Sequence, residues 1–231
     1  MRIRAVIFDL DNTLYSYDDA HAAAFEALAE YARRTLGTDA AAFRALHREA
    51  MDEQIRRAGA VCAAIHNRLI RFQLILERLG RPAALAPEMA ERYWTAFLDA
   101  VRPGPGLGEC LAALEAAGIR VGVGTNMTAD YQYAKLQRLG ILQRLNFFVS
   151  SEEVNAEKPD RKLFDCCAWK AGCPAGECVF VGDNPVHDVR GARDAGMFPV
   201  WLCADPDAQI EGVPRVRSLA ELPALLRALE E

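Results

Sequence analysis

Hydrophobic and polar residues follow two patterns along this chain. The first pattern consists of short runs rich in branched apolar residues, which are typical of buried strands. These runs lie at residues 5–8, 119–124, 146–150, 178–181 and 198–202. From residue 107 onward they alternate with segments whose apolar residues recur three or four positions apart, which is typical of helices. These segments lie at 107–117, 129–139, 160–171, 186–195 and 219–229. The alternation predicts an α/β fold, a doubly wound and mainly parallel sheet with helices on both faces.

A long stretch between the first two strands lacks the strand pattern. Its helical segments lie at 20–36, 39–57, 61–79 and 87–100. Since the first strand has no helix partner outside this stretch, we interpret the stretch as an insertion into the α/β fold. The sequence therefore predicts an α/β core domain of residues 1–16 and 101–231 and an all-helical domain of residues 17–100.

Composition is that of an ordinary globular protein, with 52% hydrophobic and 26% charged residues. The net charge of −5 gives no support to a nucleic acid polymer or an anionic membrane as partner, because both call for basic patches. No apolar run approaches the ~18 residues of a membrane-spanning helix, and the first residues lack a signal-peptide pattern. The seven cysteines are odd in number, include no C-x-x-C motif and lie mostly in apolar runs. We therefore expect reduced thiols in a cytoplasmic protein.

Two carboxylates follow the first strand, at Asp9 and Asp11. Residues two apart in an extended chain point to the same side, so both side chains can share one small volume beyond the strand end. Open parallel sheets bind their ligands at that edge. Two close carboxylates repel each other, which raises the pKa of one of them unless a cation lies between them. Taken alone, the pair is consistent with a divalent-metal site, with an acid/base pair that shares a proton, or with an acidic turn.

Polar residues of other kinds follow the remaining strands of the predicted core. They are Thr125 and Asn126, then Lys158 after a loop, then Asp183, Asn184 and Asp188. Carboxylates bind the hard cation Mg²⁺, a hydroxyl beside free backbone N–H groups binds phosphate, and a lysine attracts phosphate oxygens. Singly, Thr125 is consistent with a helix cap, Lys158 with a surface residue and Asp183 with a turn. Because such groups occur at successive strand ends, we interpret them together as one site.

In these residues the chain resembles the haloacid dehalogenase superfamily, specifically its phosphatase branch with a helical cap inserted after the first strand. Residues 9–13, Asp-Leu-Asp-Asn-Thr, resemble that family's first motif, D-x-D-x-T. Thr125 is similar to the second motif, and Lys158 with Pro159 resembles the third. Residues 182–188 resemble the fourth. The resemblance covers the chain outside the helical insertion and implies a Rossmann-like core whose cap closes over the site.

The resemblance implies a role for each matching residue. Asp9 is expected to attack phosphorus as the nucleophile, and Asp11 to protonate the leaving oxygen and then activate the hydrolytic water. Thr125 and the N–H of Asn126 are expected to hold the phosphate. Lys158 is expected to tie the nucleophile and the phosphate together electrostatically.

The resemblance also implies Mg²⁺ as the cofactor. Its expected ligands are the Asp9 carboxylate, the Asp11 backbone carbonyl and Asp183. Expected around these ligands are Asp188, Thr13 and Asn184. Asp188 is expected to orient a metal-bound water or Lys158, and Thr13 to brace the loop.

The second aspartate decides between activities within the family. The family's dehalogenases lack a carboxylate at the position of Asp11, because a halide leaves without a proton. We therefore expect a phosphatase that acts on a small phosphorylated metabolite, such as a nucleoside monophosphate or a sugar phosphate. The alternatives are a phosphosugar mutase of the same family and an inactive relative that serves as a binding or scaffold protein. A phospho-accepting receiver domain would be about half as long and would lack the helical insertion.

Overall fold

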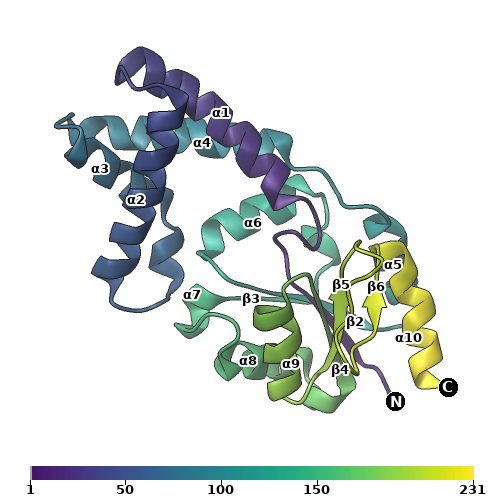
Figure 1. The fold of residues 1–231 in the computed structure, drawn as a ribbon. Helices are drawn as coiled ribbons and strands as arrows, with labels where there is room; N and C mark the ends of the chain where they lie inside the picture. The colour runs from purple at the N-terminus through teal and green to yellow at the C-terminus, as the bar shows by residue number, and fades with distance from the viewer. Residues whose placement is uncertain (1) are drawn as a thin grey trace. The chain divides into compact units, whose positions relative to one another are not determined.

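The chain folds into two compact units in the computed structural model, which describes residues 2–231. The first unit comprises Met1–Ser16 and Arg102–Glu231, and the second comprises Tyr17–Val101. The first unit is α/β and the second is helical (Figure 1). The helical unit is therefore an insertion in the sequence of the α/β unit.

Within residues 2–231 the α/β unit holds one sheet of parallel strands, in the order β3-β2-β1-β4-β5-β6. The strands are β1 (Ala5–Phe8), β2 (Arg120–Thr125), β3 (Phe147–Ser150), β4 (Cys178–Gly182), β5 (Phe198–Leu202) and β6 (Arg215–Val216). The predicted parallel α/β fold is confirmed. The last strand is absent from the prediction, because two residues are too few to show a period.

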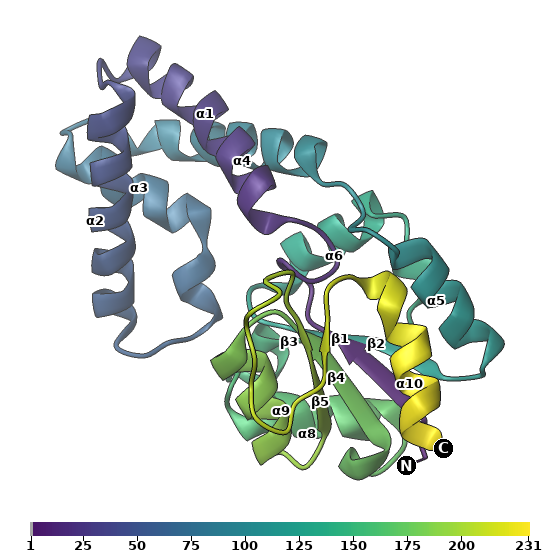
Figure 2. The same ribbon diagram turned by 45° about the vertical axis from the view of Figure 1, so that its right-hand side comes forward.

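Helices cover both faces of the sheet (Figures 1 and 2). On one face lie α5 (Leu107–Ala116) and α10 (Leu222–Glu230). On the other face lie α8 (Arg161–Ala171) and α9 (Gly191–Asp194). The further helices of this unit are α6 (Ala129–Arg138), α7 (Ser151–Val154) and the short η3 (Leu142–Arg144), η4 (Ala175–Glu177), η5 (Pro185–Arg190) and η6 (Leu219–Glu221).

The central strand β1 sets the position of the residues that follow it. All of its residues are fully buried, and Ile7 packs with Phe180 of β4 in the core that α8 covers. Phe8 pairs in register with Val123 of β2 and with Val181 of β4. Since the three strands are parallel and aligned, the residues beyond their ends meet at one edge of the sheet.

The second unit is built from helices, and α2 shows a recognisable cap at each end. Its longer helices are α1 (Tyr17–Thr35), α2 (Ala40–Ala58), α3 (Arg68–Arg78) and α4 (Ala86–Ala100), and a short η2 (Ala83–Leu85) precedes α4. Asp39 caps α2, because its carboxylate accepts a hydrogen bond from the N–H of Ala42 at 2.8 Å. Gly59 ends the same helix with a φ of 68°, a left-handed conformation that favours glycine.

The prediction of one helix over residues 61–79 is wrong. Residues 63–66 form a short 3₁₀ helix, η1 (Ala63–His66), and α3 begins after Asn67, whose side chain caps it. Gln54 holds this turn, since its amide donates to the carbonyls of Ala64 at 2.7 Å and Asn67 at 3.0 Å. A side chain from another helix thus satisfies these carbonyls, which periodicity along the chain cannot reveal.

The prediction of one helix over residues 186–195 also needs correction. The segment divides into a π-helical turn, η5, and the short α9. Asn184 caps η5, because its side-chain oxygen accepts hydrogen bonds from the N–H groups of Val186 and His187, both at 2.9 Å. The last predicted helix likewise begins with the 3₁₀ turn η6.

A buried histidine lies among aromatic rings inside the helical unit. The ring of His47 meets that of Phe25 edge-on, with centroids 5.4 Å apart, and lies 6.4 Å from that of Phe72. His47 is 8% exposed, and its Nε2 is buried without a hydrogen-bond partner. Burial, followed by the charges of Arg71 and Arg68, lowers the pKa of His47 to about 3. The ring is therefore neutral near pH 7.

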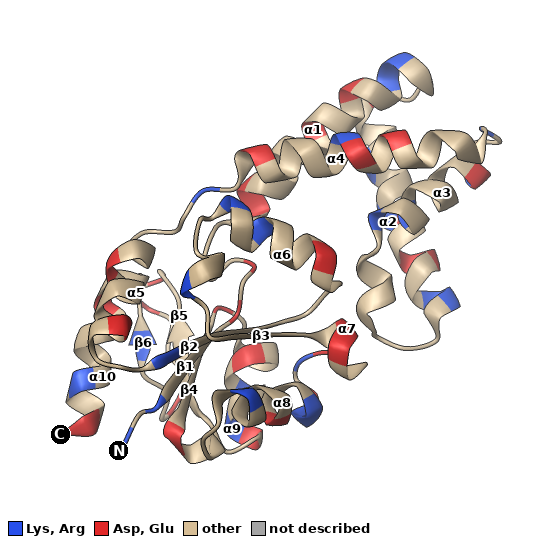
Figure 3. Ribbon diagram, turned by 180° about the vertical axis from the view of Figure 1, so that it is seen from behind, with Lys and Arg blue, Asp and Glu red and all other residues tan. Residues whose placement is uncertain are grey.

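Acidic and basic residues are interspersed over the helices of each unit (Figure 3). Some are paired along one helix, as Arg34 is with Glu30 and Arg92 with Glu88. Across residues 2–231, no helix combines the length and the apolar character needed to cross a membrane. All seven cysteines are free thiols.

Candidate active site

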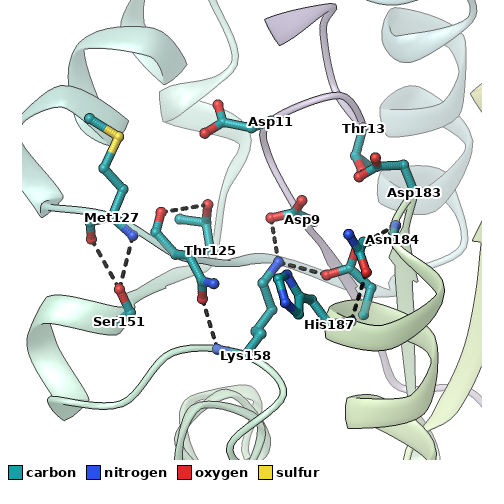
Figure 4. Close-up of polar contacts among 12 residues, drawn as sticks. Asp9, Asp11, Thr13, Thr125, Met127, Ser151, Lys158, Asp183, Asn184 and His187 are labelled. Atoms are coloured by element: carbon teal, nitrogen blue, oxygen red, sulfur yellow. Dashed lines mark hydrogen bonds and ion pairs between the residues drawn. The ribbon is translucent and has the colours of Figure 1, made fainter. Parts of the chain in front are cut away.

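Carboxylates from three points of the α/β unit converge where β1 and β4 end (Figure 4). Asp9 follows β1, Asp183 follows β4, and Asp188 lies in η5. Each offers one carboxylate oxygen, and these oxygens lie within 4.8 Å of one another. Because hard divalent cations prefer carboxylate oxygens, the cluster fits a divalent-metal site.

Lys158 joins two of these carboxylates. Its ammonium lies 2.5 Å from Oδ1 of Asp9 and donates to Oδ1 of Asp188 at 2.7 Å. The other oxygen of Asp188 accepts from the backbone N–H of Asn184 at 2.9 Å. Lys158 is 4% exposed, and its own backbone N–H donates to Oδ1 of Asn126 at 2.8 Å. The side chain and backbone of Lys158 therefore link the ends of β1, β2 and β4.

The charges in this cluster do not balance. Burial raises the pKa of Asp9 to about 8; Lys158 opposes that rise and Asp188 adds to it. Burial and then Asp188 raise the pKa of Asp183 to about 6. Burial alone would lower the pKa of Lys158, but Asp188 and Asp9 outweigh it and leave that pKa raised. One ammonium faces three carboxyl groups, so a divalent cation would supply the missing positive charge and lower the pKa values of Asp9 and Asp183.

The loop after β2 is held beside the cluster by its own hydrogen bonds. Thr125 is 1% exposed, and its hydroxyl donates to the carbonyl oxygen of Asn126 at 3.2 Å. Met127 has a φ of 100°, and its N–H donates to Oγ of Ser151 at 2.9 Å. Thr128, not Thr125, occupies the cap position of α6. Thr125 therefore ends a strand at the site, and the helix-cap interpretation of this residue is wrong.

Two residues of α6 that no motif singled out also lie at the site. Lys135 is fully buried, and its ammonium donates to Oδ1 and Oδ2 of Asp11 at 2.8 and 3.0 Å. Gln132 is fully buried too, and its amide donates to the hydroxyl of Thr125 at 2.7 Å. Residues three apart on a helix share one face. The rarity of lysine in this chain is a sequence signal that draws attention to Lys135, but it does not show that the side chain is buried.

Asp11 is set apart from Asp9, and its carboxylate points away from that of Asp9 (Figure 4). Burial favours the neutral acid, but Lys135, followed by hydrogen bonds from Tyr15 and Gln132, outweighs burial and holds the pKa of Asp11 below its ordinary value. The two carboxyl groups therefore shift in opposite directions, Asp9 upward and Asp11 downward. Sequence reasoning expects an ionised Asp9 and a protonated Asp11. Burial accounts for the upward shift at Asp9, and Lys135, which reaches Asp11 from a helix distant in sequence, accounts for the downward shift at Asp11.

Thr13 and Asn184 brace the edge of the site. The hydroxyl of Thr13 donates to Oδ1 of Asp183 at 3.4 Å. Asn184 caps η5 and also donates its N–H to Asp188. His187 contributes its backbone N–H to this cap, and its side chain is exposed. The predicted site residues thus gather at one edge of the α/β unit, while their individual chemical roles stay predictions.

Comparisons with known proteins identify the family. Residues 3–196 match the family described as haloacid dehalogenase-like hydrolases. The ribulose-1,5-bisphosphate 5-phosphatase of Halopiger xanaduensis is 35% identical over 211 residues, which cover 89% of this chain and 86% of that protein. The glyceraldehyde 3-phosphate phosphatase of Methanopyrus kandleri is 35% identical over 204 residues, which cover 87% and 84%. The crystal structure of a 2-haloacid dehalogenase from Pseudomonas syringae pv. Tomato is similar with a TM-score of 0.77 and 26% identity, covering 98% of this chain and 99% of that one.

The family match and the site geometry agree. The matched residues include Asp9, Thr125, Lys158 and Asp183, which lie together at the carboxyl ends of the parallel strands. The two phosphatases are more similar in sequence to this chain than the dehalogenase is. The chain belongs to the haloacid dehalogenase-like hydrolases, and within that family it is a phosphoric monoester hydrolase of the phosphatase branch.

Proposed function

We propose that this enzyme hydrolyses small phosphorylated metabolites with the help of Mg²⁺ and through an aspartyl-phosphate on Asp9. One observation carries the proposal. The carboxylate of Asp9 meets the buried ammonium of Lys158, with the carboxylate of Asp183 on one side and the hydroxyl of Thr125 on the other (Figure 4). This arrangement supplies a nucleophile, a fixed positive charge, a metal ligand and a phosphate-binding group within one small volume.

Hydrolysis takes two steps in this proposal. In the first, an Oδ atom of Asp9 bonds to phosphorus while the bond from phosphorus to the ester oxygen breaks, and Asp11 gives its proton to that oxygen. In the second, Asp11 takes a proton from a water molecule whose oxygen attacks the same phosphorus. Phosphate leaves, the Asp9 carboxylate is restored, and Asp11 releases the proton that it took from water once the site is empty.

The free enzyme favours the ionised form of Asp11. Approach of an anionic phosphate opposes that preference, because a nearby negative charge favours the neutral form of a carboxyl group. Binding of the substrate is therefore the event that we expect to give Asp11 its proton.

The metal has a clear place in this scheme. The Asp9 carboxylate, the Asp11 backbone carbonyl and Asp183 would hold Mg²⁺. When bound, it screens the repulsion between the Asp9 carboxylate and the phosphate anion. Lys158 adds a fixed positive charge beside Asp9, and Asp188 keeps that ammonium in place.

In this proposal the phosphate binds on the side of Asp9 that faces Thr125, opposite Asp183 (Figure 4). The hydroxyl of Thr125 and the N–H of Asn126 would donate to its oxygens. Asn126 is itself held, because its side-chain oxygen accepts from the N–H of Lys158. The loop is therefore formed before the substrate arrives.

The relatives favour a sugar phosphate over a nucleoside monophosphate as the substrate. The two phosphatases at 35% identity are named for ribulose 1,5-bisphosphate and glyceraldehyde 3-phosphate, both of which are sugar phosphates. We assign the choice among such substrates to the helical insertion, residues 17–100, acting as the cap domain.

Phosphate release from a panel of metabolites tests the proposal. The panel contains both sugar phosphates, a series of nucleoside monophosphates and 4-nitrophenyl phosphate, each with MgCl₂ or with a chelator. We expect Mg²⁺-dependent release with the highest kcat/KM on a sugar phosphate, and none from Asp9→Asn. Full activity of Asp9→Asn contradicts the assigned nucleophile, and activity that survives chelation contradicts the metal.

A further inference from the structure

One face of α6 contacts both the residue expected to protonate the leaving group and the residue expected to bind the phosphate. Gln132 and Lys135 lie on this face, and neither belongs to a motif of the family resemblance. Both are 0% exposed, although glutamine and lysine are seldom fully buried. Their burial therefore calls for an explanation beyond packing.

Lys135 fixes the carboxylate of Asp11. Its ammonium donates to both oxygens, at 2.8 and 3.0 Å, and also lies 3.7 Å from the sulfur of Met127. The ammonium stands 5.9 Å from the ring centroid of Tyr15, whose hydroxyl in turn donates to Oδ1 of Asp11. A buried charge is costly unless it is paired, so Lys135 and Asp11 strongly constrain each other's positions.

Gln132 connects this carboxylate to the phosphate-binding loop. Its amide nitrogen donates to the hydroxyl of Thr125 at 2.7 Å and to the carbonyl oxygen of Asn126 at 2.9 Å. The same nitrogen lies 3.5 Å from Oδ2 of Asp11. The amide group of Gln132 therefore holds the Asp11 carboxylate at a fixed distance from the loop that is expected to bind the phosphate.

We propose that Lys135 and Gln132 are positioning residues, which hold the Asp11 carboxyl group at the place where it meets the leaving oxygen of a phosphate bound at Thr125. The inference rests on the proposed function, because it takes over the roles given there to Asp11 and Thr125. Lys135 and Gln132 touch neither phosphorus nor the leaving group in this scheme, and they act through the residues that do.

This role makes a prediction that depends on the leaving group. An alkoxide from a sugar is a poor leaving group and needs a proton in the transition state, whereas 4-nitrophenolate leaves without one. A displaced Asp11 therefore slows hydrolysis of an alkyl phosphate far more than hydrolysis of an aryl phosphate. A general loss of structure would slow both to the same extent.

The experiment compares kcat and KM for 4-nitrophenyl phosphate and glyceraldehyde 3-phosphate at one pH and at saturating MgCl₂. The variants are Lys135→Met, Gln132→Met, Asp11→Asn and the double variant Lys135→Met with Asp11→Asn. Lys162→Met, the same change at an exposed lysine of α8, is the matched control. Activity on the aryl ester also reports that each variant has folded.

We expect Lys135→Met to lower the ratio of the alkyl rate to the aryl rate by about tenfold or more. The limit is the whole contribution of general acid catalysis, which is ~10²-fold or larger. Gln132→Met should change the ratio in the same direction and carries the test if Lys135→Met does not fold. In the Asp11→Asn background, Lys135→Met should lower the alkyl rate no further. Lys162→Met should keep the ratio of the wild type.

Two results overturn the inference alone. The first is an active wild type in which Asp11→Asn changes the ratio and neither α6 variant does. The second is a full additional loss when Lys135→Met is combined with Asp11→Asn. A wild type that releases phosphate from neither ester overturns the proposed function and this inference together.

Discussion

Lys158 and Asp188 form a buried ion pair, with 2.7 Å between Nζ and Oδ1 and with side chains that are 3% and 1% exposed. The second oxygen of Asp188 accepts from the N–H of Asn184. With both oxygens engaged, Asp188 is suited to hold Lys158 against Asp9 rather than to react. This relationship leads to the first prediction.

Asp188→Asn should lower kcat by about 10- to 100-fold, the usual range for residues that orient a reacting group at a metal site. The melting temperature of the metal-free protein should change little, because loss of the ion pair with Lys158 is offset by weaker repulsion from Asp9 and Asp183. Steady-state kinetics and thermal unfolding measure the two effects. Asp165→Asn removes an exposed carboxylate that pairs with Arg161 and serves as the control, with no change in kcat expected. Unchanged kcat in Asp188→Asn would refute this role.

The raised pKa values of Asp9 and Asp183 predict how metal binding depends on pH. The folded protein holds a proton on Asp9 up to about pH 8, whereas the unfolded chain loses it near 3.8. Between these values the folded state binds more protons, so the metal-free protein should lose stability as pH rises. A cation displaces this proton, so its affinity should increase over the same window.

The rise in melting temperature on adding MgCl₂ measures this effect. The rise should be larger at pH 8 than at pH 6, and Asp9→Asn should remove most of the difference. KCl at equal ionic strength separates metal binding from screening. An equal rise at both pH values would contradict the assigned linkage.

Much of the site was predictable because its residues directly follow strands that the local hydrophobic pattern reveals. The apolar run before Asp9 and the runs before Thr125 and Asp183 are buried strands whose parallel register is set by the core. Their polar successors must therefore meet at one edge, whatever the details of the helices. Local pattern and global fold agree at these positions.

The remaining features depend on contacts between segments distant in sequence. Lys135 reaches Asp11 across 124 positions, and nothing in the pattern of α6 distinguishes a buried lysine from a solvent-exposed one. The break before α3 has the same origin, since Gln54 of α2 satisfies carbonyls of that turn. Periodicity within one segment carries no information on a partner supplied by another.

The neutral histidine inside the helical unit predicts sensitivity to acid. The pKa of His47 is lowered to about 3, against an ordinary value of 6.5, by burial and then by Arg71 and Arg68. As pH falls below about 6.5 the unfolded chain takes up a proton first, so the free energy of unfolding decreases, by at most about 1.4 kcal/mol per pH unit. His47→Leu should flatten this decrease in urea unfolding curves between pH 7 and pH 4.

An exposed histidine provides the control for that measurement. His187→Leu should leave the slope of unfolding free energy against pH unchanged, because its side chain is exposed. A slope in His47→Leu as steep as in the wild type would show that other groups cause the acid sensitivity.

Removing the hydroxyl of Thr125 should lower kcat/KM because phosphate binding is weakened. Thr125→Val keeps the shape of the side chain but removes the hydroxyl, and one hydrogen bond to a charged group contributes about 1.5–3 kcal/mol. We expect kcat/KM to fall by about 10- to 100-fold. Thr128→Val, a partly exposed position whose hydroxyl caps nothing, should have no such effect. Equal losses in both variants would point to disturbance of the loop rather than to a lost phosphate contact.

The covalent intermediate on Asp9 is the central claim, and rapid acid quenching of the enzyme with a substrate labelled in its phosphoryl group tests it most directly. The account predicts label on the peptide that contains Asp9, released by hydroxylamine as expected of an acyl phosphate, and no label in Asp9→Asn. Turnover by the wild type with no labelled protein at any quench time, or label on a peptide without Asp9, would contradict it.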